Sequence, residues 1–197
     1  MSDQNLEAFK NQLLAEMKNM SFHDHEASAS DGVSEIFWSI GPSYSIVPLE
    51  LEMCGLVPSR ITAKEPSVKR NAQKIHCCGG QVVSIEYFND YGIAHAEERF
   101  FYSESRYFSL KTNYHKEKLW LKMSELELGK TVRAGRVDHD LEFWTFQYEW
   151  SEDTVKEITS LCSNSLPGVV LYPEYMDSEL TRLYFVKEGE QVDVLGR

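Results

Sequence analysis

The sequence lacks the short motifs that mark common classes of enzyme. It contains no nucleophile elbow, phosphate-binding loop, dinucleotide-binding fingerprint, HExxH zinc motif or EF-hand loop. None of its four cysteines forms a CxxC pair, which favours free thiols in a reducing compartment. There is no N-terminal signal-peptide pattern and no run near the ~20 apolar residues of a membrane span. We therefore expect a soluble cytoplasmic protein that is not an enzyme and uses no cofactor.

Positive charge is also scarce. The chain has 20 Lys and Arg against 31 Asp and Glu, a formal net charge of −11. Phosphate binding needs clustered basic residues, so this balance argues against nucleic acid and anionic membranes as partners. It favours solubility and fast encounter with a basic protein, although many cytosolic proteins are acidic without such a partner.

The first 73 residues predict a helix followed by short extended segments. Apolar residues at three- and four-residue spacing indicate an amphipathic helix whose stripe faces the core. Glu35–Ile40 and Tyr44–Cys54 are predicted as strands, and residues 55–73 as a long, locally basic connection. The helical stripe consists of Leu6, Phe9, Leu13, Leu14, Met17 and Met20.

Residues 74–197 predict an antiparallel β-meander. Polar turn signals recur about every 10–14 residues, and the segments between them alternate apolar and polar side chains. The expected fold is mainly β (α+β): about eight to ten twisted strands, curled toward a half-barrel, behind one N-terminal helix. Residues 1–73 and 74–197 are expected to form one structural unit, with the first part packed on the sheet.

Two histidine clusters resemble reactive or metal sites. His23 and His25 could both reach one metal ion from an extended segment, but at a helix end they are more simply solvated polar residues. Asp138-His139-Asp140 looks catalytic, yet it falls at a predicted hairpin tip, where Asp serves turn geometry. We favour the turn interpretation and expect no catalytic residue.

Carboxylates gather near strand ends, several of them beside aromatic residues. An aromatic surface rimmed by carboxylates could bind a basic protein, although the same aromatics could instead form the core face of the sheet. The candidate partner-binding residues are Glu97, Glu98, Asp138, Asp140, Glu142, Trp144, Tyr148, Trp150, Glu152 and Asp153.

Gln81–Leu161 resembles the β-repeat immunity proteins of bacterial polymorphic-toxin systems. The segments that carry the resemblance are Ile85–Gly92 (IEYFNDYG), Gly135–Asp138 (GRVD) and Gln147–Val155 (QYEWSEDTV), each similar to a strand and acidic-turn unit. The resemblance implies a small cytosolic protein that binds and neutralises a cognate toxin domain. It assigns no functional residue by position.

Three functions are therefore open. The first is an immunity-type inhibitor, monomeric or homodimeric, that binds a basic toxin domain. The second is a ligand-binding or hydrolytic β protein with an aromatic-lined pocket, which a closed cavity holding His95 or the Cys77 region together with perturbed carboxylates would favour. The third is an oligomeric adaptor that pairs through its edge strands.

Overall fold

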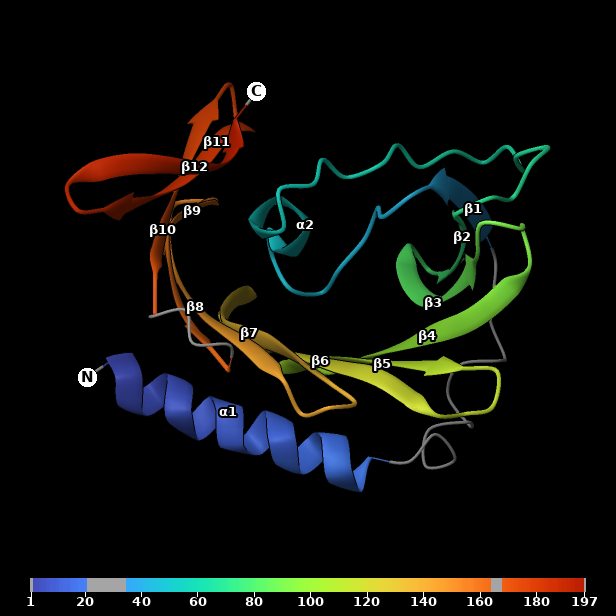
Figure 1. Ribbon diagram of the computed structural model, residues 1–197, viewed down its shortest axis with the longest axis horizontal. Helices are drawn as coiled ribbons and strands as arrows, with labels where there is room; N and C mark the ends of the chain where they lie inside the picture. The colour runs from blue at the N-terminus through green and yellow to red at the C-terminus, as the bar shows by residue number, and fades with distance from the viewer. Residues whose placement is uncertain (1, 21–34, 164–167, 197) are drawn as a thin grey trace.

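The computed structural model describes residues 2–20, 35–163 and 168–196 (Figure 1). In this part of the chain, one 12-stranded antiparallel sheet runs in sequence order from β1 to β12 and stays open, with β1 and β12 as its edges. The expected mainly β meander with one N-terminal helix is confirmed. The elements are α1 (Ser2–Asn19), β1 (Glu35–Ile40), α2 (Glu50–Met53), β2 (Ala72–Cys78), β3 (Gln81–Phe88), β4 (Ala94–Tyr102), β5 (Arg106–Asn113), β6 (Lys118–Glu127), β7 (Lys130–Asp138), β8 (Phe143–Ser151), β9 (Thr154–Cys162), β10 (Val170–Met176), β11 (Glu179–Lys187) and β12 (Glu190–Gly196).

From β2 to β9, and again from β10 to β12, tight turns join consecutive strands. Both residues of Leu128-Gly129 and of Glu188-Gly189 have positive φ, as two-residue type I′ hairpins require. Gly79-Gly80, also at positive φ, makes a further turn that the sequence analysis missed, so more strands form than expected. The turn predicted around residue 164 lies partly outside the described residues.

Helix α1 covers the outer side of the curled sheet, across β6, β7 and β8 (Figure 1). The predicted core-facing stripe is confirmed, because Leu6, Phe9 and Leu13 are at most 2% exposed. Glycine at position 135 of β7 allows this close approach, since a Cβ there would lie 3.2 Å from Cδ2 of Leu13. The outer core consists of Phe9, Leu13, Met17 and Met20 packed on Leu110, Leu121, Met123 and Val137.

Residues 41–71, here called the inner connection, cross the hollow side of the sheet from the end of β1 toward β12 (Figure 1). The strand predicted over Tyr44–Cys54 is wrong: this segment is a loop followed by the short helix α2. Pro48 has no N–H to give a ladder, and Leu49 adopts a left-handed φ of 57°, so an extended strand cannot continue here. The boundary expected at residue 73 falls inside β2, a strand of the common sheet.

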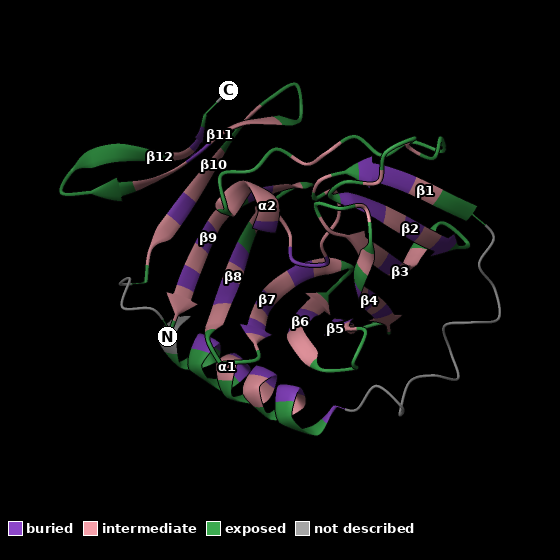
Figure 2. Cartoon of the chain, turned by 45° about the vertical axis from the view of Figure 1, so that its right-hand side comes forward, coloured by how far each residue is buried: buried purple, intermediate pink, exposed green. Residues whose placement is uncertain are grey.

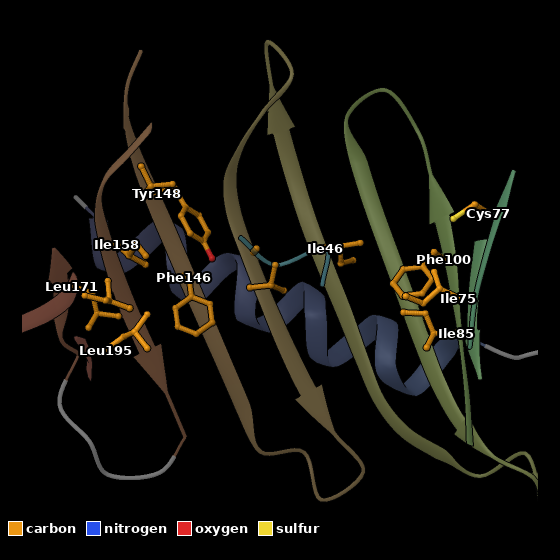
Figure 3. Packing of buried hydrophobic residues seen from close by; sticks show 14 residues of the cluster. Ile46, Ile75, Cys77, Ile85, Phe100, Phe146, Tyr148, Ile158, Leu171 and Leu195 are labelled. Carbon is orange, nitrogen blue, oxygen red and sulfur yellow. The ribbon is translucent and has the colours of Figure 1, made fainter. Parts of the chain in front are cut away.

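The inner core fills the trough between the two sides of the curled sheet (Figure 3). Ile46 of the inner connection lies in it, between Ile85 on one side and Ile158 on the other, and Val47 belongs to the same cluster. Buried and more exposed residues alternate along many strands, as Figure 2 shows, because successive side chains point to opposite faces. On β6 both faces are buried, one under α1 and one under the inner connection.

Candidate ligand-binding cleft

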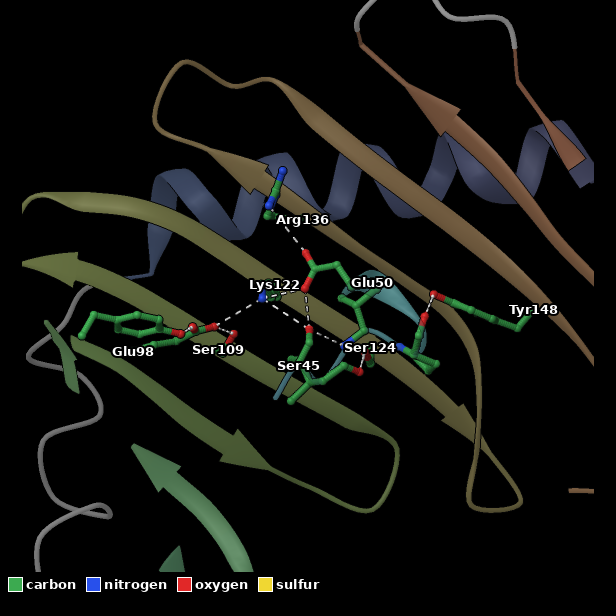
Figure 4. Close-up of polar contacts among 12 residues, drawn as sticks. Ser45, Glu50, Glu98, Ser109, Lys122, Ser124, Arg136 and Tyr148 are labelled. Carbon is green, nitrogen blue, oxygen red and sulfur yellow. Dashed lines mark hydrogen bonds and ion pairs between the residues drawn. The ribbon is translucent and has the colours of Figure 1, made fainter. Parts of the chain in front are cut away.

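A buried ion pair fastens the inner connection to the centre of the sheet (Figure 4). The Lys122 ammonium of β6 lies 2.7 Å from the Glu50 carboxylate of α2 and 3.8 Å from Glu98 of β4. Ser45 donates a hydrogen bond of 2.5 Å to the same Glu50 oxygen. Ser109 and Tyr87 donate hydrogen bonds of 2.6 and 2.5 Å to Glu98. These contacts satisfy charges that would otherwise be costly to bury.

The surroundings of Glu98 and Lys122 favour the charged form of each group. Burial by itself raises the pKa of Glu98, but Lys122 and the two hydroxyl donors outweigh it and leave the pKa below its usual value. Burial likewise lowers the pKa of Lys122, and Glu98 and Glu50 outweigh it and raise the pKa above its usual value. The centre of the trough therefore holds fixed charges at neutral pH.

A second buried lysine, Lys111 of β5, lies between two aromatic rings. Its ammonium is 3.4 Å from the ring centroid of Tyr87 and 3.9 Å from that of Trp120. Both rings offer their faces to the cation, which is a favourable arrangement. Burial nevertheless lowers the pKa of Lys111 to about 8.

Arg136 of β7 points into the trough beside these groups. Its guanidinium carbon lies 4.4 Å from the ring centroid of Trp144, the residue opposite it on β8. The charged group nearest to it is Glu50, with 3.7 Å between Nη1 and Oε1. Among the described residues, no hydrogen bond uses its donors. We call Glu50, Glu98, Lys111, Lys122 and Arg136 the inner charge cluster.

Arg136, Trp144 and Glu50 line one part of a cleft of about 640 Å³. The cleft opens between α2 and the strands from β7 to β12, and most of its wall is apolar. Its remaining charged residues, Lys187 and Glu188, are exposed at the end of β11. The apolar wall includes Met53, Trp144, Phe146, Leu171, Phe185 and Val194.

The structure does not bring the predicted partner-binding residues onto one surface. Asp138, Asp140 and Glu142 belong to the turn between β7 and β8, whereas Glu152 and Asp153 belong to the next turn. Successive turns of a meander lie at opposite ends of the strands, so these two groups are separated by the length of β8. Glu97 and its neighbour Glu98 point to opposite faces of β4.

Several of these residues have structural partners inside the molecule. Glu98 is fully buried, and Tyr148, 4% exposed, donates a hydrogen bond of 2.9 Å to the carbonyl of Pro48. Trp150 donates one of 2.7 Å to the carbonyl of Thr131. Trp144 and Tyr148 face the trough, which agrees with the interpretation of the aromatics as a core face. Glu98 and Tyr148 cannot contact a partner directly in this conformation.

The turn interpretation of Asp138 agrees with its contacts. Its carboxylate accepts hydrogen bonds of 3.0 Å from the backbone N–H groups of Asp140 and Glu142. The cleft includes neither His95, which is exposed, nor Cys77, which is buried in the inner core. No group of three or more His, Cys, Asp and Glu in residues 2–20, 35–163 and 168–196 could hold a metal ion. His23 and His25 lie outside the described residues.

Sequence reasoning missed the inner charge cluster. Lys122 alternates with Leu121 and Met123, and such alternation is typical of a strand with one solvated face. One signal was available. The chain has a helix to cover one face of the sheet and residues 41–71 to cover the other, so the face formed by Trp120, Lys122 and Ser124 need not be exposed to solvent. The pairing of Glu50 with Lys122 joins residues 72 positions apart, which no local pattern indicates.

Comparison with known proteins adds no relative. No protein-family model matches the chain, and no curated protein sequence matches it significantly. Within the described part of the chain, neither helix combines the length and apolar character needed to cross a membrane.

Proposed function

We propose that this protein binds a small amphipathic molecule in the cleft beside Arg136 and Trp144. The observation that carries the proposal is the cleft itself, with a volume of about 640 Å³ and a largely apolar wall. Small-molecule sites are typically concave, about 300–1,000 Å³ in volume, apolar, and equipped with a few polar groups that orient the ligand. A ligand-binding β protein with an aromatic-lined pocket is thus the function that the geometry supports best.

The surroundings of the cleft favour a preformed site. Glu50 at its wall is fixed by Lys122 and Ser45, and the Trp144 ring lies against the guanidinium of Arg136, the residue opposite it. A ligand would find these groups already in place, so little binding free energy would be spent on ordering them.

The neutral fluorescent probe N-phenyl-1-naphthylamine tests this proposal. Val186 is 50% exposed and lines the cleft, so Val186→Trp should obstruct it. Val192 on neighbouring β12 is 38% exposed and does not line it, which makes Val192→Trp a matched control. We expect saturable binding to the wild type and the control, and binding at least about tenfold weaker to Val186→Trp. Absence of saturable binding, or equal binding by all three proteins, would overturn the proposal.

A second candidate function, the immunity-type inhibitor, is favoured by the turns at one end of the strands. Three neighbouring turns at this end, β4–β5, β6–β7 and β8–β9, carry exposed carboxylates, and adjacent hairpins lie about 10 Å apart. Leu128 in the middle turn is fully exposed, with a relative exposure of 104%. An exposed apolar side chain with carboxylates on its own turn and on the neighbouring turns is suited to a basic partner with a small apolar pocket. Lys130, 3.4 Å from Asp153, offsets part of this negative charge. We call the following exposed residues of these turns the acidic edge: Glu104, Glu127, Leu128, Glu152 and Asp153.

The inhibitor function predicts that a basic toxin domain is encoded next to this gene, and that domain would be the binding partner used in the test. Neutralising the acidic edge with Glu127→Gln, Glu152→Gln and Asp153→Asn should slow association at low salt by about tenfold. The matched control neutralises carboxylates in the turns at the other end of the strands, with Glu117→Gln, Asp140→Asn and Glu142→Gln. It should change association little. Equal effects of the two triple variants would rule out the acidic edge as the docking surface.

A further inference from the structure

We propose that the ligand of the cleft carries a carboxylate, and that this group binds the guanidinium of Arg136 while the apolar part lies against the wall. This inference rests on the proposed ligand-binding function and adds the chemical class of the ligand. It predicts a monocarboxylate with an alkyl or aryl body.

The first argument is the unused hydrogen-bonding capacity of Arg136. A guanidinium has five N–H donors in a planar fork that matches the two oxygens of a carboxylate. In the described chain the group makes only the 3.7 Å ion pair with Glu50 and the stacking contacts with Trp144 and Trp120. The Arg136 side chain is 27% exposed, so water can accept hydrogen bonds from these donors when no ligand is bound. An oxyanion entering the cleft would replace that water with a charged acceptor that matches the fork.

The second argument is the charge balance of the inner charge cluster. Its three cations, Lys111, Lys122 and Arg136, face only two carboxylates, Glu50 and Glu98. The Glu50 carboxylate already forms an ion pair with Lys122 and accepts a hydrogen bond from Ser45, so it compensates the charge of Arg136 only in part. One additional negative charge at Arg136 would bring the cluster to neutrality. The other charged wall residues, Lys187 and Glu188, carry opposite signs and offset one another.

The third argument is the position of the apolar wall. Trp144 covers one face of the Arg136 guanidinium, and its neighbour on the same face of β8, Phe146, continues the wall toward Leu171 and Phe185. When a ligand binds Arg136 through its carboxylate, the apolar body attached to that carboxylate would therefore lie directly against the apolar wall. A small inorganic anion would leave that surface empty, so an amphipathic monocarboxylate fits the cleft better.

Three ligands with the same ten-carbon chain test the inference: decanoate, 1-decanol and decylammonium. Calorimetric titration should show decanoate binding about tenfold or more tightly than decanol, and decylammonium binding most weakly. Arg136→Gln should abolish the preference for decanoate over decanol. Arg136→Lys, which keeps the charge but not the planar fork, should retain part of it. Arg133→Gln is the matched control, because Arg133 lies on the same strand, points to the other face and pairs with Glu125 at 2.8 Å.

The outcomes separate this inference from the function on which it rests. Equal affinity for decanoate and decanol, or a preference that survives in Arg136→Gln, would overturn the carboxylate assignment and leave the ligand-binding function intact. Failure of the wild type to bind the neutral naphthylamine probe saturably would overturn the ligand-binding function itself. Thermal unfolding of each variant, followed by circular dichroism, verifies that lost binding is not lost folding.

Discussion

Lys122 and Glu50 form an ion pair of 2.7 Å in which both side chains are more than nine-tenths buried. The pair connects β6, at the middle of the sheet, with α2 in the inner connection. Ser124, two residues further along β6, adds a hydrogen bond of 2.7 Å to the carbonyl of Ile46. The inner connection is thus fastened to the sheet by charged and polar contacts as well as by apolar packing.

Removing one partner of this pair should strongly destabilise the protein. Lys122→Met leaves Glu50 and Glu98 buried without their main counter-charge, and we expect the free energy of unfolding to fall by about 3–5 kcal/mol. In Lys122→Met/Glu50→Gln the loss should be smaller than the sum of the two single losses, because the uncompensated charge at Glu50 is gone. Urea denaturation of the four proteins measures both quantities. Additive losses would mean that the two groups do not interact energetically.

Lys111 should make stability rise with pH above neutrality. Burial lowers its pKa from 10.5 to about 8 in the folded protein, so between these values the unfolded chain binds more protons than the folded one. The free energy of unfolding then increases with pH in this window. Lys111→Met lacks this contribution. The stability of the wild type relative to this variant should therefore increase between pH 8 and pH 10, as measured by urea denaturation in a reducing buffer.

Comparison with this variant removes the effects of other groups. The pKa values of Cys54, Cys162 and Tyr44 are raised, mainly by burial, and their titration in the unfolded chain opposes the expected trend. These groups are present in both proteins, so their contributions cancel in the difference. A difference that stays constant from pH 8 to pH 10 would contradict the environment assigned to Lys111.

Helix α1 should contribute substantially to stability through one face only. Leu13 is completely buried against the sheet, and Leu13→Ala should lower the free energy of unfolding by about 2–5 kcal/mol. Leu14, the next residue, is only partly buried, so Leu14→Ala is the matched control and should cost clearly less. Chemical denaturation of both variants measures the difference. Similar losses would indicate that the helix does not dock as described.

The turn between β6 and β7 should be a site where stability can be gained. Leu128 has a left-handed φ of 51° and is fully exposed, whereas type I′ turns favour Asn before Gly. Leu128→Asn should raise the free energy of unfolding by about 1 kcal/mol, because the short polar side chain of Asn tolerates the left-handed conformation better than that of Leu. If the acidic edge binds a partner through Leu128, the same variant should weaken that binding. A destabilised variant would contradict the turn geometry.

Local periodicity in the sequence was sufficient to predict the helix, most turns and the meander. The stripe from Leu6 to Met20 and the turn at Asn89–Gly92 both depend on neighbouring residues, and both occur in the structure. The inner connection was harder to predict, because its apolar residues near Pro48 are buried although they form no strand. Their alternation resembles β periodicity, while the left-handed Leu49 that ends it has no signature in the sequence.

The candidate site was predictable only in its aromatic part. The side chains of Trp144, Phe146 and Tyr148 share a face, as the alternation along β8 indicates, and two of them line the cleft. Which residues from other elements join them depends on how strongly the sheet curls, a global property. Arg136 and Glu50 meet because the inner connection returns into the trough. Carboxylates that seemed close along the chain, such as Glu142 and Glu152, are separated by a full strand.

The sequential order of the sheet has a kinetic consequence. Every strand pairs with the strand next to it in the chain, so hairpins can close with little loop entropy and low contact order favours rapid zippering. In contrast, the hydrogen bonds from Tyr148 to Pro48 and from Lys118 to Met17 span 100 and 101 residues. Docking of the inner connection and of the N-terminal helix should therefore be the late events of folding. Until they occur, the curled sheet exposes two apolar faces, and self-association during synthesis is the hazard that this architecture has to avoid.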